Sequence, residues 1–212
     1  RGYARELAER EEAAADRDAA LRRVLDHYLA ATGELGAEGL VLLDRERWAE
    51  AAETLDDALH RAEAGGGEPG GGEQGDGEQG GGDPSAIFLA RLDLARALTM
   101  TGDLDRAIDL LGPLPDGFAA LPEPDEHNRA RALSSLGEAY LRARRPVAAI
   151  NFFGQALEIL RRQDDVDQQA GMFVHIADAA RQRGDHVAEG AARDRAAELY
   201  ASLSARGEPS GG

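Results

Sequence analysis

The chain lacks cysteine and lysine, two residue types on which much enzyme chemistry depends. It holds no Cys, and all 24 of its basic residues are Arg. Without cysteine there are no disulfides, thiolate nucleophiles or cysteine zinc sites, a composition that fits a reducing cytosol. Without lysine there is no P-loop lysine, Schiff base or lysine general base. We therefore expect a cytoplasmic protein that does not use these nucleophiles and bases.

Aromatic residues and long apolar runs are also scarce. Aromatic residues make up 5% of the chain, whereas hydrophobic residues make up 42%, most of them Ala and Leu. This mixture favours close packing of helices over strands. Because no run of about 18 apolar residues occurs, the sequence predicts no membrane-spanning helix.

Positive charge is in deficit, with 40 acidic against 24 basic residues and a net charge of -16. Contacts to phosphate require a cationic surface, so we expect no direct binding of DNA or RNA by this chain. The sequence begins at Arg1 within a helical pattern, without a starting Met or a signal-peptide pattern. We expect it to be part of a longer protein.

The clearest pattern lies between residues 130 and 162. Leu133, Leu136 and Tyr140 form one apolar stripe at helical spacing, with Gly137 beside it. Pro146 is acceptable where a second helix begins, because no amide hydrogen is needed there. This pattern predicts an antiparallel helix hairpin whose second helix shares one face among Ala149, Ile150, Phe153, Ala156, Leu157 and Leu160.

Similar hairpins are predicted on both sides of this one. Leu94, Leu136 and Ile176 occupy equivalent places, and the sequence predicts hairpins over 84–114, 124–162 and 165–205, the last helix acting as a cap. Gly102-Asp103 and Gly184-Asp185 are the expected turns within two of them. Residues 112–125 hold four of the eight prolines, so we expect an irregular connector there.

Residues 34–64 carry a weaker version of the pattern. Trp48, Ala51 and Leu55 fit a second helix, whereas Gly36 and Gly39 weaken the first. A single helix running through Glu46 is the alternative. The Gly-rich acidic segment 65–83 cannot build a core, and we expect this insert and the tail 206–212 to be disordered.

A small residue at each hairpin contact, followed in two cases by a Gly-Asp turn, resembles the tetratricopeptide (TPR) repeat, a helix hairpin of about 34 residues. HEAT-like repeats have periods closer to the 42 and 40 residues that separate Leu94, Leu136 and Ile176, but they do not explain these small residues and turns. The resemblance implies an all-α, TPR-like α-solenoid with an N-terminal helical extension. It also implies a concave groove, lined by the first helix of each hairpin, that binds a peptide or protein partner or another domain of the same polypeptide.

The residues expected on that concave face alternate in charge, and an ordinary solvated surface is the alternative interpretation. At the positions where chaperone-binding TPRs hold a terminal carboxylate with Lys, Asn and Arg, this chain has residues such as Leu89, Asp93 and Gly171. This departure argues against a chaperone tail as the partner. The predicted partner-binding residues are Arg96, Met100, Arg131, Ser135, Glu138, Arg142, His175, Asp178 and Arg181.

No catalytic, cofactor or metal site is predicted. The five His residues are scattered without ligand spacing, and Ser134 and Ser135 lack the flanking glycines of a hydrolase elbow. A basic group offers an anion or nucleotide site as one interpretation, although arginines also favour helix C-termini through the helix dipole. Its members are Arg142, Arg144, Arg145, Arg161 and Arg162.

Residues 1–33 carry a second resemblance. Tyr3–Ala8 is similar to the end of the winged-helix subdomain of bacterial STAND-type regulators, the NB-ARC ATPases, and Ala20–Leu29 is similar to the helix that follows it. This resemblance implies an ATP-binding part upstream and a sensory role in signal transduction or transcription regulation for this chain. A stand-alone TPR adaptor is the alternative, and an enzyme of unrecognised type is the third possibility.

Overall fold

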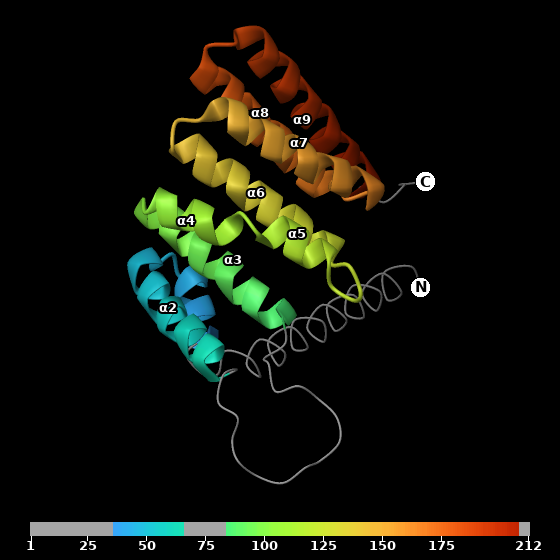
Figure 1. The fold of residues 1–212 in the computed structure, drawn as a ribbon. Helices are drawn as coiled ribbons and strands as arrows, with labels where there is room; N and C mark the ends of the chain where they lie inside the picture. Colours follow the sequence, from blue (N-terminus) through green and yellow to red (C-terminus); the bar gives the residue numbers. More distant parts are fainter. Residues whose placement is uncertain (1–35, 66–83, 208–212) are drawn as a thin grey trace. The chain divides into compact units, whose positions relative to one another are not determined.

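The structure is a computed structural model that describes residues 36–65 and 84–207, and within these two ranges every regular element is a helix (Figure 1). The predicted all-α class of TPR-like helix hairpins is confirmed. The chain falls into two compact units, residues 1–90 and 91–212. The predicted N-terminal segment 1–33, the insert 65–83 beyond Gly65 and the tail from residue 208 onward lie outside the described residues.

In the first unit, the chain turns at residues 45–46 between two helices. The alternative prediction was a single helix running through Glu46. Residues 36–44 are helical, and α2 (Trp48–Gly65) begins after a turn in which Glu46 has φ 56°. Ala51, Leu55 and Ala58 of α2 are fully buried. A Cβ atom on Gly39 would lie 2.5 Å from Leu55 Cγ, so this glycine permits close contact with Leu55. Gly39, expected only to weaken its helix, therefore has a packing role.

The helices α3 (Pro84–Thr101) and α4 (Leu104–Leu111) follow in the chain. Ala95 of α3 and Ala107 of α4 are both fully buried. Gly102 has φ 94°, a left-handed conformation that suits glycine at the end of a helix.

The predicted irregular connector over residues 112–125 is partly wrong, because it contains the short helix α5 (Leu114–Ala119). Leu114 and Phe118, four residues apart, are both fully buried, and α5 packs against the next helix, α6. Pro115 lies in the first turn, where its missing amide hydrogen leaves no helical bond unmade. Local proline content suggested a loop, whereas burial of the apolar pair stabilises a helix.

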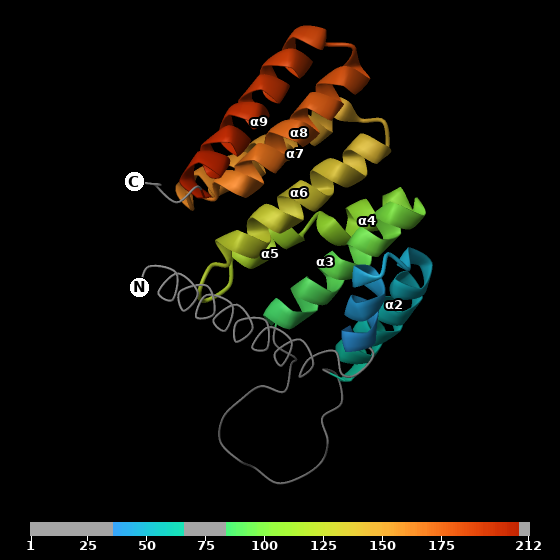
Figure 2. The ribbon, with the colours of Figure 1, turned by 180° about the vertical axis from the view of Figure 1, so that it is seen from behind.

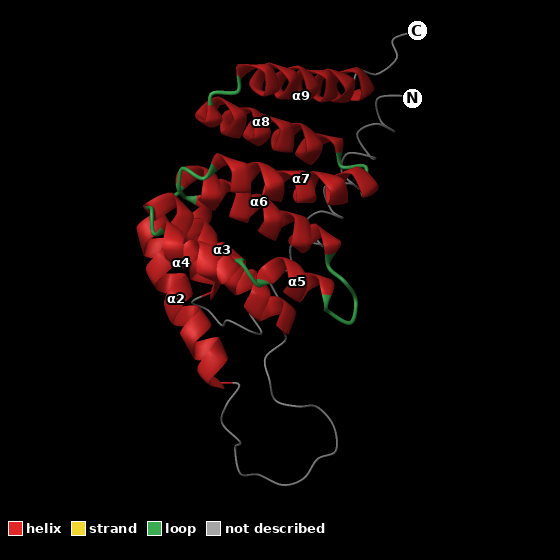
Figure 3. Cartoon of the chain, turned by 45° about the horizontal axis from the view of Figure 1, so that its top comes forward, coloured by secondary structure: helices red, strands yellow, loops and turns green. Residues whose placement is uncertain are grey.

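The remaining helices are α6 (Glu126–Arg142), α7 (Pro146–Arg162), α8 (Val166–Arg183) and α9 (His186–Gly207). Each packs against the next in chain order, as Figures 2 and 3 show. Their interior is built from small side chains around one large ring: a Cβ on Gly137 would lie 2.8 Å from Phe153 Cζ. The buried cluster comprises Ala130, Leu133, Ala149, Phe153, Ala156, Leu157, Ile159, Leu160, Met172 and Ala179.

One type of turn recurs between consecutive helices. Its central residue has a positive φ, and the amide of the following residue donates to a carbonyl five residues earlier, as Arg145 N does to Tyr140 O at 2.9 Å. This is the Schellman arrangement, which favours glycine at the left-handed position. The positions are occupied by Glu46, Gly102, Arg144, Asp164 and Gly184. The three with side chains each carry a strain of about 1 kcal/mol.

Aspartates cap three of the helices. The carboxylates of Asp125, Asp165 and Asp185 accept hydrogen bonds from the amides three residues later, at 2.9 to 3.0 Å. Each bond satisfies an amide that has no partner within its own helix. These caps fix where α6, α8 and α9 begin.

Candidate partner-binding face

All nine predicted partner-binding residues lie on α3, α6 and α8, the first helices of the three hairpins. On α6, Arg131, Ser135, Glu138 and Arg142 are spaced by four, three and four positions, so they share one stripe of the helix. We use the term first-helix face for the surface of α3, α6 and α8 on which these nine residues lie. The structure assigns different environments to its members.

Met100 and Arg142 meet on this face from two different helices. Arg142 Nη2 donates to Met100 Sδ at 3.0 Å, and Arg142 Nε lies 3.2 Å from Glu138 Oε1. Met100 remains 36% exposed and the Arg142 side chain 41%. An accessible apolar group therefore lies beside a charged pair, where a partner can contact both.

Arg131 is engaged with a buried carboxylate that the sequence did not mark as structural. Asp93 is buried on α3, and its Oδ1 lies 3.7 Å from Arg131 Nη2 and 3.6 Å from Arg96 Nη1. Burial raises the pKa of Asp93 above its ordinary value, and the two neighbouring arginines oppose this shift without cancelling it. Arg96 and Arg131 therefore compensate an internal charge as well as lying on the first-helix face.

The Asp93→Asn variant is expected to be more stable than the parent chain at pH 7. The folded state binds the Asp93 proton more tightly than the unfolded chain does, so stability from this group falls as the pH rises above the ordinary value of 3.8. Asparagine imitates the protonated form and does not titrate. Chemical denaturation of both proteins between pH 4 and 7 should show a difference that shrinks as the pH falls.

Other acidic groups titrate in both proteins and cancel in that difference. Asp185 is an example: the hydrogen bond from the Ala188 amide lowers its pKa, and it does so equally in the parent and in the variant. A difference in stability between parent and variant that grows on acidification would contradict the assignment of Asp93.

His175 also has an internal role. Its ring stacks on Phe153, with centroids 5.1 Å apart and planes inclined by 15°. Phe153 is fully buried, so this histidine covers the hydrophobic core. Three of the nine predicted residues, Arg96, Arg131 and His175, therefore also make contacts with buried residues.

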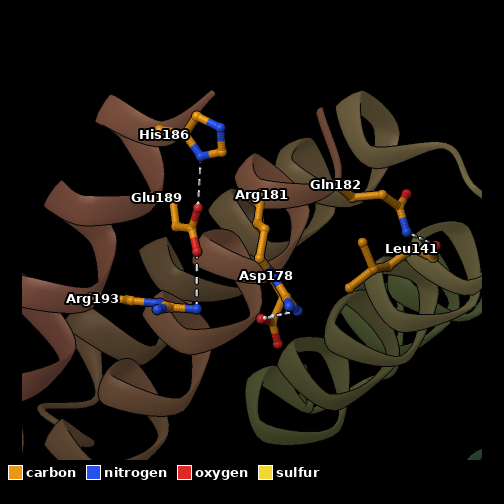
Figure 4. A network of polar contacts seen from close by, with 7 residues as sticks. All are labelled: Leu141, Asp178, Arg181, Gln182, His186, Glu189 and Arg193. Carbon is orange, nitrogen blue, oxygen red and sulfur yellow. Dashed lines mark hydrogen bonds and ion pairs between the residues drawn. The ribbon is translucent and has the colours of Figure 1, made fainter. Parts of the chain in front are cut away.

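A pocket of about 370 Å³ lies between the C-terminal end of α6 and α8. Gln182 Nε2 donates to the Leu141 carbonyl at 3.1 Å, and Arg181 Nη2 bonds to Asp178 Oδ1 at 2.9 Å, as Figure 4 shows. The lining residues are Leu141, Arg144, Asp178, Arg181 and Gln182. The pocket thus includes two predicted residues and Arg144, which the sequence placed only in a basic group.

The predicted basic group does not act as one site. Arg161 pairs with Glu158 at 2.7 Å, Arg162 with Glu126 at 3.6 Å, and Arg145 lies over the Tyr140 ring at 6.0 Å. By contrast, the described residues provide no ion-pair partner for Arg144. This arginine is therefore the member best placed to meet an external anion.

Within the described ranges, no group of three or more His, Asp or Glu side chains is arranged to hold a metal ion. None of the helices described combines the length and apolar character needed to cross a lipid bilayer.

Residues 86–162 match the family model described as "Tetratricopeptide repeat". A solved structure with a similar chain is the crystal structure of BtubC (BKLC) from P. vanneervenii, at 16% identity and a TM-score of 0.45, over 96% of this chain and 94% of that chain. No curated protein matches the sequence. The family match, which extends from α3 to the end of α7, supports a tetratricopeptide-repeat protein.

Proposed function

We propose that this chain is a non-catalytic protein-interaction module that binds a peptide or protein segment on its first-helix face. The TPR match supports this function, because such repeats generally bind protein or peptide partners. The observation that carries it is the accessible contact between Met100 and Arg142, which joins α3 to α6. Methionine and arginine are both enriched at protein interfaces.

The chemistry of the face suits a partner of mixed character. Besides Met100, Val174 on α8 is 41% exposed. The charges nearby occur as pairs, Arg142 with Glu138 and Arg181 with Asp178. A partner segment with apolar side chains flanked by charges of both signs would complement this surface.

Arg142→Glu is expected to weaken partner capture by about tenfold, because it removes a cation and places two carboxylates together. The matched control is Arg161→Glu on α7, since Arg161 is similarly exposed and also pairs with a glutamate of its own helix. Proteins retained from a cell lysate by the full chain would be quantified by mass spectrometry. If both variants lost a retained protein equally, its binding site would not be specific to the first-helix face.

Arg131→Glu is unsuitable for this experiment. It would place a second carboxylate beside the buried Asp93 and would change stability as well as binding.

We propose that the wider setting is a sensory module of a cytoplasmic signal-transduction ATPase or transcriptional regulator, in which partner binding shifts an on/off equilibrium. The resemblance of residues 1–33 to STAND-type regulators motivates this setting, although those residues lie outside the described ones. A stand-alone adaptor that joins two proteins without any such switch is the alternative. Sequencing the upstream coding region distinguishes them: a GxxxxGK[ST] segment after a predicted strand supports the regulator, and its absence favours the adaptor.

A further inference from the structure

Arg144 has three properties, and no other residue of the pocket has all of them. It lines the 370 Å³ pocket, its guanidinium has no ion-pair partner among the described residues, and its backbone has φ 60°. Arg181, the other arginine in the pocket, is held by Asp178. The pocket therefore presents one uncommitted positive charge.

We propose that this pocket binds an acidic side chain of a partner peptide, with Arg144 as the group that holds its carboxylate. The inference rests on the proposed function and deepens it by naming the partner chemistry. Arginine binds carboxylates through two parallel N–H donors, which gives such a contact both strength and a defined geometry. Arg181 stays paired with Asp178, so the positive charge available to a partner carboxylate is that of Arg144.

The charge of the rest of the chain makes this site selective. The net charge is -16, so an acidic peptide is repelled by most of the molecule. The ionisable side chains of the pocket are Arg144, Arg181 and Asp178, two cations against one anion. Because the Debye length at physiological salt is about 8 Å, this local surplus governs binding within the pocket.

Gln182 adds a polar group to the lining of the pocket. Its Nε2 is bound to the Leu141 carbonyl, and its Oε1 is buried without a hydrogen-bond donor from the described residues. A buried acceptor without a donor is unfavourable. A peptide N–H that enters next to the carboxylate would supply that donor once the amide shifts to meet it.

Because Arg144 lies at a left-handed turn position, one substitution can test its role in binding without lowering stability. A left-handed residue with a side chain is strained, and glycine occupies the same turn position at Gly102 and Gly184. Arg144→Gly therefore removes the guanidinium while relieving backbone strain. We expect this variant to bind less well and to melt at an unchanged or higher temperature.

The test uses a capped, fluorescein-labelled peptide of three consecutive glutamates and the full chain, with fluorescence anisotropy as the readout. We expect saturable binding that Arg144→Gly weakens by about tenfold or more. Glu46→Gly is the matched control, because Glu46 occupies the equivalent turn position and does not line the pocket. It should raise the melting temperature and leave binding unchanged.

The proposal would be overturned by no binding of the glutamate peptide, by equal binding of the corresponding glutamine peptide, or by undiminished binding to Arg144→Gly. Competition by free glutamate at the affinity of the peptide would also overturn it, by indicating a site for a small anion. The proposed function fails separately, through the Arg142→Glu capture experiment. Loss of Arg142-dependent capture and loss of Arg144-dependent peptide binding are thus independent readouts.

Discussion

Gly137→Ala is expected to destabilise the α6–α7 hairpin by about 1–3 kcal/mol, although alanine is ordinarily the better helix former. The added Cβ would lie 2.5 Å from Phe153 Cδ1 and 2.8 Å from Cζ. The ring has little room to move, because Phe153 is fully buried and its face is stacked on His175. Urea denaturation followed by far-UV circular dichroism measures the change.

Gly154→Ala on α7 is the matched control. A Cβ at Gly154 would meet nothing within 4 Å, so helix propensity alone should decide the result. We expect a gain of about 0.5–1 kcal/mol. If Gly137→Ala also gave a gain, the contact between Gly137 and Phe153 would not limit the approach of the two helices.

A second substitution isolates the contact itself. Phe153→Leu removes the ring atoms that the new methyl group meets, while it keeps an apolar side chain in the core. In the Gly137→Ala background, we expect Phe153→Leu to cost less than it does alone. Such coupling, measured by a double-mutant cycle, would assign the effect to this pair of residues.

The sequence predicted the α6–α7 hairpin well because the relevant signals are local. Helical periodicity places Leu133, Leu136 and Tyr140 on one stripe. Gly137 beside them has no side chain, which marks the point where another helix can approach closely. Gly39 shows the limit of this reasoning. Its propensity suggested a weak helix, whereas its function depends on contact with Leu55 on the other side of a turn.

The candidate site was predicted in outline but not in detail. Spacing placed the nine residues on the first helices, because that assignment needs only helix boundaries and periodicity. The contact of Arg142 with Met100 joins positions 42 apart, and such pairings depend on how the helices pack. Arg144 lines a pocket together with residues of α6 and α8, a juxtaposition that also depends on helix packing, and no local sequence rule predicts its left-handed backbone.

The short helix α5 shows how a buried apolar pair can outweigh proline content. Pro113 precedes the helix and Pro115 lies in its first turn, so neither interrupts a hydrogen bond of the helix interior. The Asp125 amide then donates to the Phe118 carbonyl at 3.0 Å and closes the segment that leads into α6. Phe118 is therefore the residue on which the prediction of a loop is best tested.

Phe118→Ala is expected to cost about 3–5 kcal/mol, because it removes a fully buried ring and leaves a cavity where α5 packs on α6. Stacked helical repeats contact mainly their neighbours, so the loss should be local. Hydrogen exchange should show faster exchange of amides in α5 and α6, with those of α9 little changed. Tyr200→Ala, at a position 44% exposed on α9, is the control and should cost far less. Equal costs for the two variants would mean that residues 112–125 act as the loop that their prolines suggested, rather than as part of the packed solenoid.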